Sequence, residues 1–295
     1  MSNDQASDAD TGPSIAARFV PLALVGLPTV FLLAFFVFPT AYLLSASFLA
    51  SDGMELTGGL TLDNYRIVLG HRVYAGAILR TFVVGIAVGA LVIAASYPLA
   101  YFLTRTTSRW KGALIALSLS PLLASVIVRT YGWYVILNRE GALNSLLLNT
   151  GLAAAPVQFL PSTGAIIIGL AHALLPYGVL SIMSSLNTLN PNLERAAMSL
   201  GANRFRTFLA VTLPLTLPGV AGGFLIAFSL AISAYATPAI LGGPATETMA
   251  TLIRNLMVVQ LDWALGSATG AILLVSALGL LLLATAFNNR RGASR

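Results

Sequence analysis

The side chains that could perform catalysis or hold a metal ion are few and widely separated in this sequence. It has no cysteine, and its two histidines, His71 and His172, lie far apart. No HExxH zinc pattern and no GxSxG serine-nucleophile pattern occurs, and the only lysine, Lys111, does not follow a glycine-rich loop of the kind that binds nucleotide phosphates. We therefore expect no metal ligand, no catalytic residue and no hydrolysis of ATP by this chain.

Three arginines and a glutamate gather instead in the stretch 194–214, ERAAMSLGANRFRTFLAVTLP. Just before it, Asn190 is a favourable N-cap and Pro191 a favourable first residue of a helix. Gly201 stands where such a helix commonly ends in the left-handed conformation. Between these limits one apolar stripe recurs with helical spacing, at Leu193, Ala196, Ala197 and Leu200.

A second amphipathic segment follows, with Arg204 and Arg206 off its apolar side, and Pro214 and Pro218 mark a return to apolar sequence. We predict two short helices joined at 201–203. From periodicity alone, they fit either a contact surface for another protein or an interfacial helix that packs on lipid headgroups.

Isolated polar residues also occur within the apolar sequence. Arg129 is the only full charge well inside an apolar stretch, where burial in lipid is costly. It either has a structural role, such as snorkelling to water, or lines a pathway, and Ser118, Ser125 and Trp133 fall near the same helical face. His172 and Pro176 are read as a satisfied hydrogen bond and a kink.

Hydroxyl and aromatic side chains have the same two readings. The hydroxyls either join helices or face a pathway, and the aromatic rings either form an interfacial belt or face an organic cation. These residues are Ser229, Ser233, Thr237, Tyr131, Trp133, Tyr134 and Tyr235.

Composition determines which elements carry these residues. Of the 295 residues, 57% are hydrophobic and only 9% are charged, whereas a soluble domain carries about a quarter charged residues. The apolar stretches do not alternate as the strands of a membrane β-barrel do, so we expect an all-α integral membrane protein with six transmembrane helices. The spans, each of about 20 residues or more, are placed at 19–48, 76–104, 113–137, 162–186, 217–241 and 263–287.

The distribution of basic residues predicts the orientation. With the N-terminus inside, ten arginines and lysines fall on inner segments and five on outer ones, as expected of cytoplasmic loops. The net charge of +6 therefore reports orientation, not nucleic-acid binding. Residues 1–18 are predicted to be a disordered cytoplasmic tail, 19–287 the membrane domain with its longest inner loop at 187–216, and 288–295 a cytoplasmic C-terminal tail.

The inner loop resembles the EAA loop of the membrane subunits of ABC importers. That pattern runs Glu-Ala-Ala, three residues, Gly, nine residues, Ile, any residue, Leu-Pro. Aligned on Gly201, the chain has Arg195-Ala196-Ala197 and, nine residues after the glycine, Val-Thr-Leu-Pro at 211–214. It departs from the pattern at Arg195, where the family has glutamate, and Glu194 lies one position earlier. The resemblance leaves open which of the two makes the charged contact.

In this family the loop is the coupling helix, which sits in a cleft on a cytoplasmic ATPase subunit. The resemblance thus implies an ATPase dimer that binds ATP and Mg²⁺, a second membrane subunit that is either a similar chain or a copy, and an external solute-binding protein. The chain itself would need no cofactor and would lie among lipids in a bacterial inner membrane, with no nucleic-acid partner. The implied coupling residues are Glu194, Arg195, Ala196, Ala197, Gly201 and Arg204.

Three further stretches, SYPLAYFLTR, IVRTYGWYVILNREGALN and TPAILGGPATETMATLI, resemble the spermidine/putrescine-type branch of these permeases. The resemblance covers most of 60–288 and implies the fold of a type I ABC importer permease that passes a polyamine or related organic solute. In the family, spans three and five line the pathway. The implied pathway residues are Arg129, Tyr131, Trp133, Ser229, Ser233, Tyr235 and Thr237, and Asp262 is a candidate for docking the binding protein, beside a partly re-entrant outer loop at 242–244.

Two other classes of function are weighed against this one. An ion-gradient-driven secondary transporter is the main alternative, but the sequence shows no inverted repeat of broken spans and no intramembrane Asp or Glu for ion coupling. A structural membrane subunit with no pathway of its own is the other.

Overall fold

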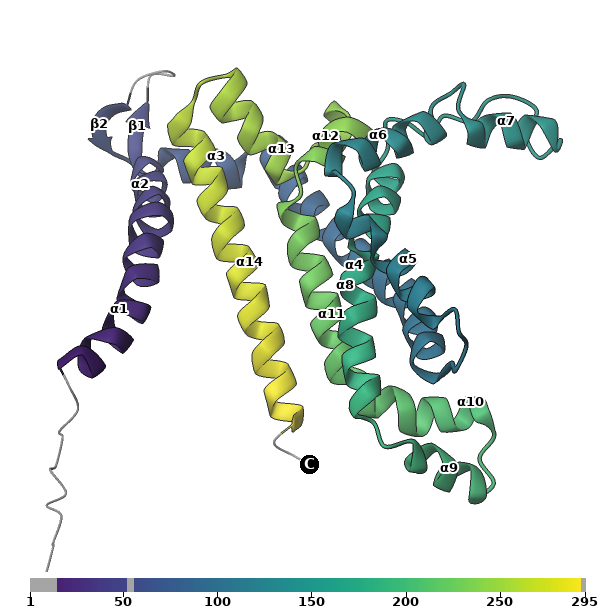
Figure 1. Ribbon diagram of the computed structural model, residues 1–295. Coiled ribbons are helices and arrows are strands. Elements are labelled where there is room, and N and C mark those ends of the chain that lie inside the picture. The colour runs from purple at the N-terminus through teal and green to yellow at the C-terminus, as the bar shows by residue number, and fades with distance from the viewer. Residues whose placement is uncertain (1–14, 52–55, 293–295) are drawn as a thin grey trace, which may run out of the picture.

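The structure, a computed structural model, describes residues 15–51 and 56–292, and this part of the chain is almost entirely helical (Figure 1). Most of the predicted N-terminal tail, residues 1–14, lies outside the described residues. The described helices are α1 (Ile15–Leu32), α2 (Phe38–Ala46), α3 (Asp63–Gly70), α4 (Arg72–Arg105), α5 (Lys111–Leu123), α6 (Val126–Leu137), α7 (Ala142–Asn149), α8 (Thr163–Thr188), α9 (Pro191–Ser199), α10 (Arg204–Thr207), α11 (Leu213–Ser233), α12 (Ala236–Leu241), α13 (Met249–Arg254) and α14 (Trp263–Gly292).

Four shorter helical segments interrupt or join these helices. They are the π-helical η1 (Leu33–Val37), η2 (Phe208–Thr212) and η4 (Asn255–Val259), and the 3₁₀ turn η3 (Pro244–Thr246). A small antiparallel hairpin of β1 (Leu49–Ser51) and β2 (Leu56–Leu60), which the sequence did not predict, follows α2. Within the described residues, five helices are long and apolar enough to span a membrane, and six if the bent pair α5–α6 counts as one span.

The centre of the molecule is formed by α4, α8 and α11, which lie side by side (Figure 1). Their facing sides are apolar, and Val88, Ile166 and Ala227 are fully buried there. Glycines bring the three backbones close together. A Cβ atom at Gly178 of α8 would lie 2.5 Å from Oγ of Ser96 and 2.7 Å from Cγ1 of Val92 on α4. Such close approach of small residues drives helix association in lipid, where apolar burial alone offers no advantage.

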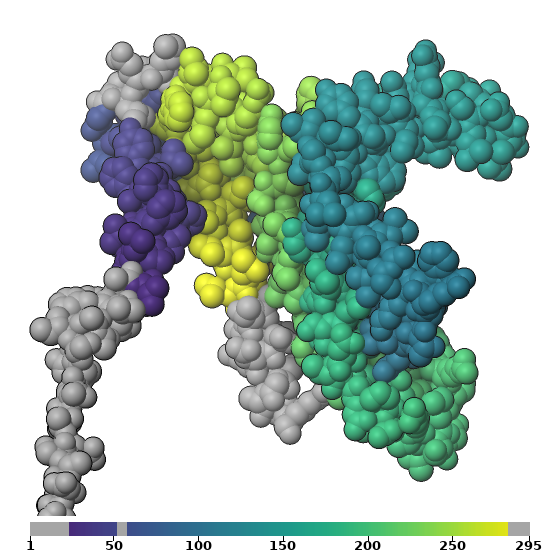
Figure 2. All heavy atoms as spheres, in the orientation of Figure 1, coloured from purple at the N-terminus to yellow at the C-terminus, as the bar shows by residue number. Residues whose placement is uncertain are grey.

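The first helix stands apart from this centre. The most apolar window of the helix from Leu24 to Ala46 has no residue buried within the chain. Figure 2 shows it as a column at one side of the molecule, against α14 and away from the central helices, while α7 extends away from the other side. Its π-helical segment η1 precedes Pro39, whose ring would clash with the carbonyl of Phe35 in a regular helix, and the wider turn relieves that clash.

The third predicted span, 113–137, is wrong as a single helix. It breaks after Leu123, where Ala124 and Ser125 have extended backbones, and the two parts meet at an angle of 98°. The argument that Ser118 shares a face with Arg129 therefore fails, because these residues lie on different helices.

The fifth predicted span, 217–241, differs at both ends. The helix begins at Arg204 and runs through η2 into α11, so the second helix of the inner loop is continuous with the span and is not a separate element. Pro214 lies within this helix, because η2 widens the turn that holds its i−4 carbonyl. At the other end the helix stops at Ser233, and a break at Ala234 precedes α12.

The remaining differences are small. The first helix begins at Ile15, inside the predicted tail, and α14 continues to Gly292, so most of the predicted C-terminal tail is helical.

The glycine contacts generate a test of the packing. Replacing Gly178 by leucine should push α8 away from α4 and destabilise the protein by about 1–3 kcal/mol, the usual cost of overpacking a core. The matched control is Gly132→Leu, a mid-helix glycine of α6 with no atom within 4 Å of its added Cβ. Thermal unfolding of the two purified variants measures the difference, and equal midpoints would contradict the close packing of α4 and α8.

Candidate functional site

The inner loop begins with a helix whose two ends are both capped. The side chain of Asn190 accepts a hydrogen bond from the backbone N–H of Asn192 at 3.0 Å. At the other end, the N–H of Gly201 donates to the carbonyl of Met198 and the N–H of Ala202 to that of Ala197. These two bonds form a Schellman motif, and Gly201 has a φ of 92°. The predicted start and stop of this helix are confirmed.

The loop then turns into the long helix that contains α11. The side chain of Asn203 accepts a hydrogen bond from the N–H of Arg206 at 2.8 Å and so caps α10. Phe208 packs edge-on against Tyr97 and Tyr101 of α4, and the hydroxyl groups of Tyr97 and Thr216 are hydrogen-bonded at 2.7 Å. The second half of the loop is thus held firmly against α4.

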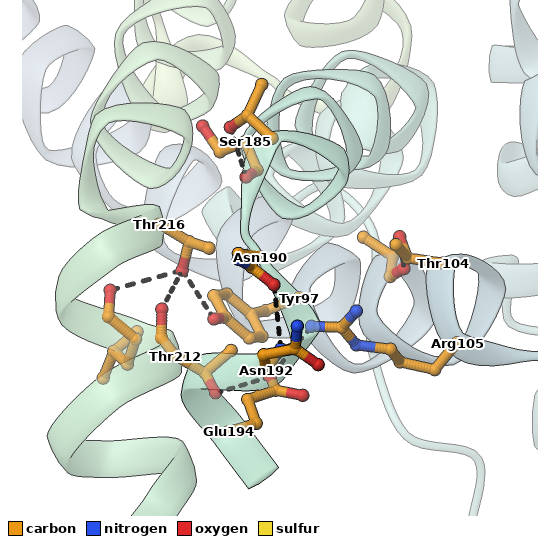
Figure 3. Close-up of polar contacts among 12 residues, drawn as sticks. Tyr97, Thr104, Arg105, Ser185, Asn190, Asn192, Glu194, Thr212 and Thr216 are labelled. Atoms are coloured by element: carbon orange, nitrogen blue, oxygen red, sulfur yellow. Dashed lines mark hydrogen bonds and ion pairs between the residues drawn. The ribbon is translucent and has the colours of Figure 1, made fainter. Parts of the chain in front are cut away.

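Glu194 of α9 is turned inward, toward the end of α4. Its Oε1 lies 2.9 Å from Nη2 of Arg105 and accepts a 2.8 Å hydrogen bond from the hydroxyl of Thr212 (Figure 3). The side chains of Arg105 and Glu194 are only 25% and 13% exposed. The guanidinium group also lies over the ring of Tyr101, 5.9 Å from its centroid. An ion pair this well enclosed attaches α9 to α4.

The neighbouring charged residues Glu194 and Arg195 therefore have different surroundings. The resemblance implies both Glu194 and Arg195 as coupling residues and leaves open which of them makes the charged contact. Because consecutive helical residues point about 100° apart, the two side chains face different surroundings. Arg195 is exposed, and its one described side-chain hydrogen bond goes to Asn192 at 3.3 Å. The nearly buried carboxylate of Glu194 has both of its partners, Arg105 and Thr212, within the chain.

The rest of the loop presents an exposed surface, which we call the docking surface. Large apolar side chains stand in solvent there, with Leu200 89% and Phe205 71% exposed. Ala196 and Gly201 are exposed as well, and Ala197 is half-buried. The docking surface consists of Leu193, Ala196, Ala197, Leu200 and Phe205, with the exposed Arg195, Arg204 and Arg206 among them.

Arg129, the first of the predicted pathway residues, caps the broken third span. Its guanidinium group donates a hydrogen bond to the carbonyl of Pro121, in the last turn of α5. The last carbonyls of a helix have no partner within it, and a cation is favoured at that end. The structure thus gives Arg129 a structural role at the break.

Several other predicted pathway residues also have partners within the chain. Thr237 is buried and lies 3.2 Å from Thr130 across the contact of α12 with α6. Trp133 donates to Nδ1 of His172 at 3.2 Å. The hydroxyls of Ser229 and Ser233 donate to carbonyls of their own helix.

Tyr131 and Tyr235 are exposed instead, at 53% and 42%. Tyr235 lines a pocket of about 280 Å³ together with Glu247 and Arg254. Asp262, the predicted docking residue, caps α14 by accepting a 3.0 Å bond from the N–H of Leu265.

A second hollow was missed by the sequence analysis. A groove of about 530 Å³ lies between α8 and α11 and is lined by Ser181, Ser184, Ser185 and Tyr177. The signal that could have revealed it is the recurrence of serines at 181, 184 and 185 within an otherwise apolar span. Arg105 was also missed as the partner of Glu194, because nothing in the sequence relates the two positions.

Comparison with known proteins identifies the fold and family, although no family model matches the chain. It is 31% identical over 253 residues to the spermidine/putrescine transport system permease protein PotB of Escherichia coli K12, covering 85% of this chain and 91% of that protein. It is 30% identical over 238 residues to PotB of Haemophilus influenzae, with 80% and 83% covered. A crystal structure of a bacterial ABC transporter that imports the acidic polysaccharide alginate matches with a TM-score of 0.77 at 18% identity, covering 94% of this chain and 97% of the other.

These matches confirm the predicted fold, that of an ABC importer permease. They set aside the alternative of an ion-gradient-driven transporter, since the relatives are named as transport system permeases, and a further relative of E. coli K12, 32% identical over 203 residues, is named as the inner membrane ABC transporter permease protein YdcU. The chain is a multi-pass inner-membrane transport subunit, not an enzyme. It belongs to the family of ABC importer permease proteins that includes PotB.

Proposed function

We propose that this chain forms part of the path for a small organic solute and is driven through its docking surface by an ATPase dimer in the cytoplasm. The observation that carries the proposal is the exposure of a short, doubly capped helix bearing large apolar side chains. ATP and Mg²⁺ are bound by the ATPase subunits. The coupling residues are Arg195, Ala196, Ala197, Gly201 and Arg204 on the exposed side of the loop, and Glu194, which holds α9 to α4 from inside the loop.

The attachments of α9 explain how movement of the ATPase would reach the membrane. Only Leu189 and Asn190 separate α9 from α8, and a single helix runs from Arg204 to the end of α11. The ion pair with Arg105 adds a link to α4. A displacement of α9 is therefore passed to the three helices at the centre of the molecule.

The exposure of the first helix supports the proposal that a second membrane subunit is present. The most apolar window of this helix has no buried residue within the chain, which leaves its sides free for a similar permease or for a copy of this chain, as well as for lipid. The solute would pass between the two membrane subunits. The serine-lined groove between α8 and α11 supplies hydroxyl groups for such a path, with Tyr131, Tyr235 and the other predicted residues nearer its outer end.

The solute class we propose is a polyamine or related organic amine, because PotB of E. coli and H. influenzae carries that name. Arg129 would repel such a cation if it faced the path. Its hydrogen bond to the carbonyl of Pro121 supports the proposal, since the guanidinium group is then committed to a helix end.

The orientation we propose places both termini in the cytoplasm. It is supported by the excess of basic residues on one end of the molecule. The hairpin, α7 and α13 lie at the opposite end of the bundle from α9 and α10 (Figure 1).

Reporter fusions test this orientation. Fusions after residues 60, 150 and 250 should read as external, and fusions near 108, 200 and 292 as cytoplasmic. A cytoplasmic reading at residue 250 would contradict the assignment.

Substitutions at the end of α9 test the coupling. A non-glycine residue in the left-handed conformation of Gly201 costs about 1–2 kcal/mol, so Gly201→Val should distort the loop and reduce uptake and binding-protein-stimulated ATP hydrolysis together. Ala197→Asp should do the same by placing a charge at the contact.

The matched control is Gly201→Asn, because asparagine tolerates the left-handed region. It should retain most of the uptake at equal expression. Full uptake by the Gly201→Val protein would show that the loop does not transmit the movement of the ATPase.

Calorimetry on the solute-binding protein of the same transporter tests the solute class. We expect it to bind spermidine or putrescine and to ignore uncharged or anionic solutes of similar size. Preference for a solute without an amine would remove the polyamine assignment and leave the coupling proposal intact.

A further inference from the structure

The charges that α9 offers to a partner differ in sign from those that its motif predicts. We propose, building on the coupling function above, that the ATPase cleft which receives this loop carries acidic side chains facing Arg195, while Arg105 withholds Glu194 from the cleft. The contact then depends on a positive permease surface and a negative ATPase surface.

The first observation is that the carboxylate of Glu194 is already engaged. Its Oε1 contacts both Nη2 of Arg105 and the hydroxyl of Thr212, at 2.9 and 2.8 Å. The side chain is 13% exposed. The Nε and Nη2 atoms of Arg105 are buried, and neither makes a hydrogen bond of regular geometry among the described residues. The ion pair with Glu194 is therefore the charge compensation that the described chain gives this guanidinium group. Releasing Glu194 to an ATPase would leave an enclosed positive charge without its counter-ion, which is unfavourable.

The second observation is the sign of the remaining charges at this end of the molecule. The other acidic residues of the described chain lie in segments at the opposite end of the molecule, where the hairpin, α7 and α13 are found. They are Asp63, Glu140, Glu247 and Asp262. On the docking surface, the exposed charges of the described chain are Arg195, Arg204 and Arg206. A cleft that contacts this surface with complementary charge must therefore be acidic.

The third observation is the direction in which α9 faces. Glu194 marks the side of the helix that points to the ends of α4 and α11. At about 100° per residue, Ala196 lies about 200° around the helix, on the side that faces away from the bundle. Leu193 and Leu200 flank it on one side and Arg195 on the other. A helix lying on lipid would direct its apolar residues toward the membrane instead, so the arrangement favours a protein in the cytoplasm.

Charge reversal at the surface is the first arm of the test. The permease, its membrane partner and the ATPase subunit are co-expressed, solubilised in detergent, and assayed for the ATPase that co-purifies. Arg195→Glu should weaken the association about tenfold or more, since it places like charges together. The matched control, Arg139→Glu, reverses an exposed arginine between α6 and α7 and should leave the association unchanged.

Exchange of the internal ion pair is the second arm. Glu194→Arg alone should destabilise the loop and reduce the amount of ATPase that co-purifies. Combining it with Arg105→Glu should restore both the thermal midpoint and the association, because the pair reforms with its charges exchanged. If Glu194 contacted the ATPase directly, the double variant would remain as defective as the single one, and the proposal would be overturned.

The two arms also separate this proposal from the coupling function. Loss of coupling in Gly201→Val, with normal ATPase association in Arg195→Glu, would keep the coupling role and overturn the acidic cleft. A defect of Arg195→Glu confined to vesicles that contain anionic lipid, with unchanged association in detergent, would assign the arginines to lipid headgroups and likewise overturn it.

Discussion

A helix in a membrane must satisfy its backbone hydrogen bonds within the protein, because hydrocarbon offers no partner for a free N–H or C=O group. This constraint explains why the irregular points of the chain are compensated. The break after Leu123 frees carbonyls at the end of α5, and Arg129 donates to one of them. The prolines at 39 and 214 follow π-helical turns that contain their i−4 carbonyls. The charge of Arg129 and the wide π-helical turns thus compensate irregularities of the helical backbone.

The same constraint makes the central helices suitable for transmitting force. Because their bonds are internal, α4, α8 and α11 are continuous rods, and their glycines allow side chains and backbones to pack closely. A short helix attached to all three cannot move without moving them. The two-residue connection to α8, the short turn at 200–203 into the helix that contains α11, and the ion pair to α4 together give α9 three attachments, of which only the first two follow from chain connectivity.

The parts of the structure that were predictable depend on local chemistry. Hydropathy located the apolar helices, because span length is fixed by the bilayer. Asn190 and Gly201 located the ends of α9, because caps act over a few residues. The 98° bend was not predictable, since the apolar run continues through it, and the pair of Glu194 with Arg105 joins residues that only the fold brings together. The hairpin at β1–β2 was too short and too weakly patterned to be recognised.

The loop also shows why a motif match fixes backbone geometry better than it fixes side-chain roles. Alignment on Gly201 places the turn correctly, because the left-handed residue and its Schellman bonds depend on the backbone. The charged position is different. Moving a glutamate by one residue rotates it by about 100°, which here takes it from a solvent-facing side to the side enclosed by α4 and η2. An arginine then occupies the solvent-facing position. The helix keeps its shape while the sign of the charge that it presents is reversed, so under the proposed coupling function the complementary cleft is acidic.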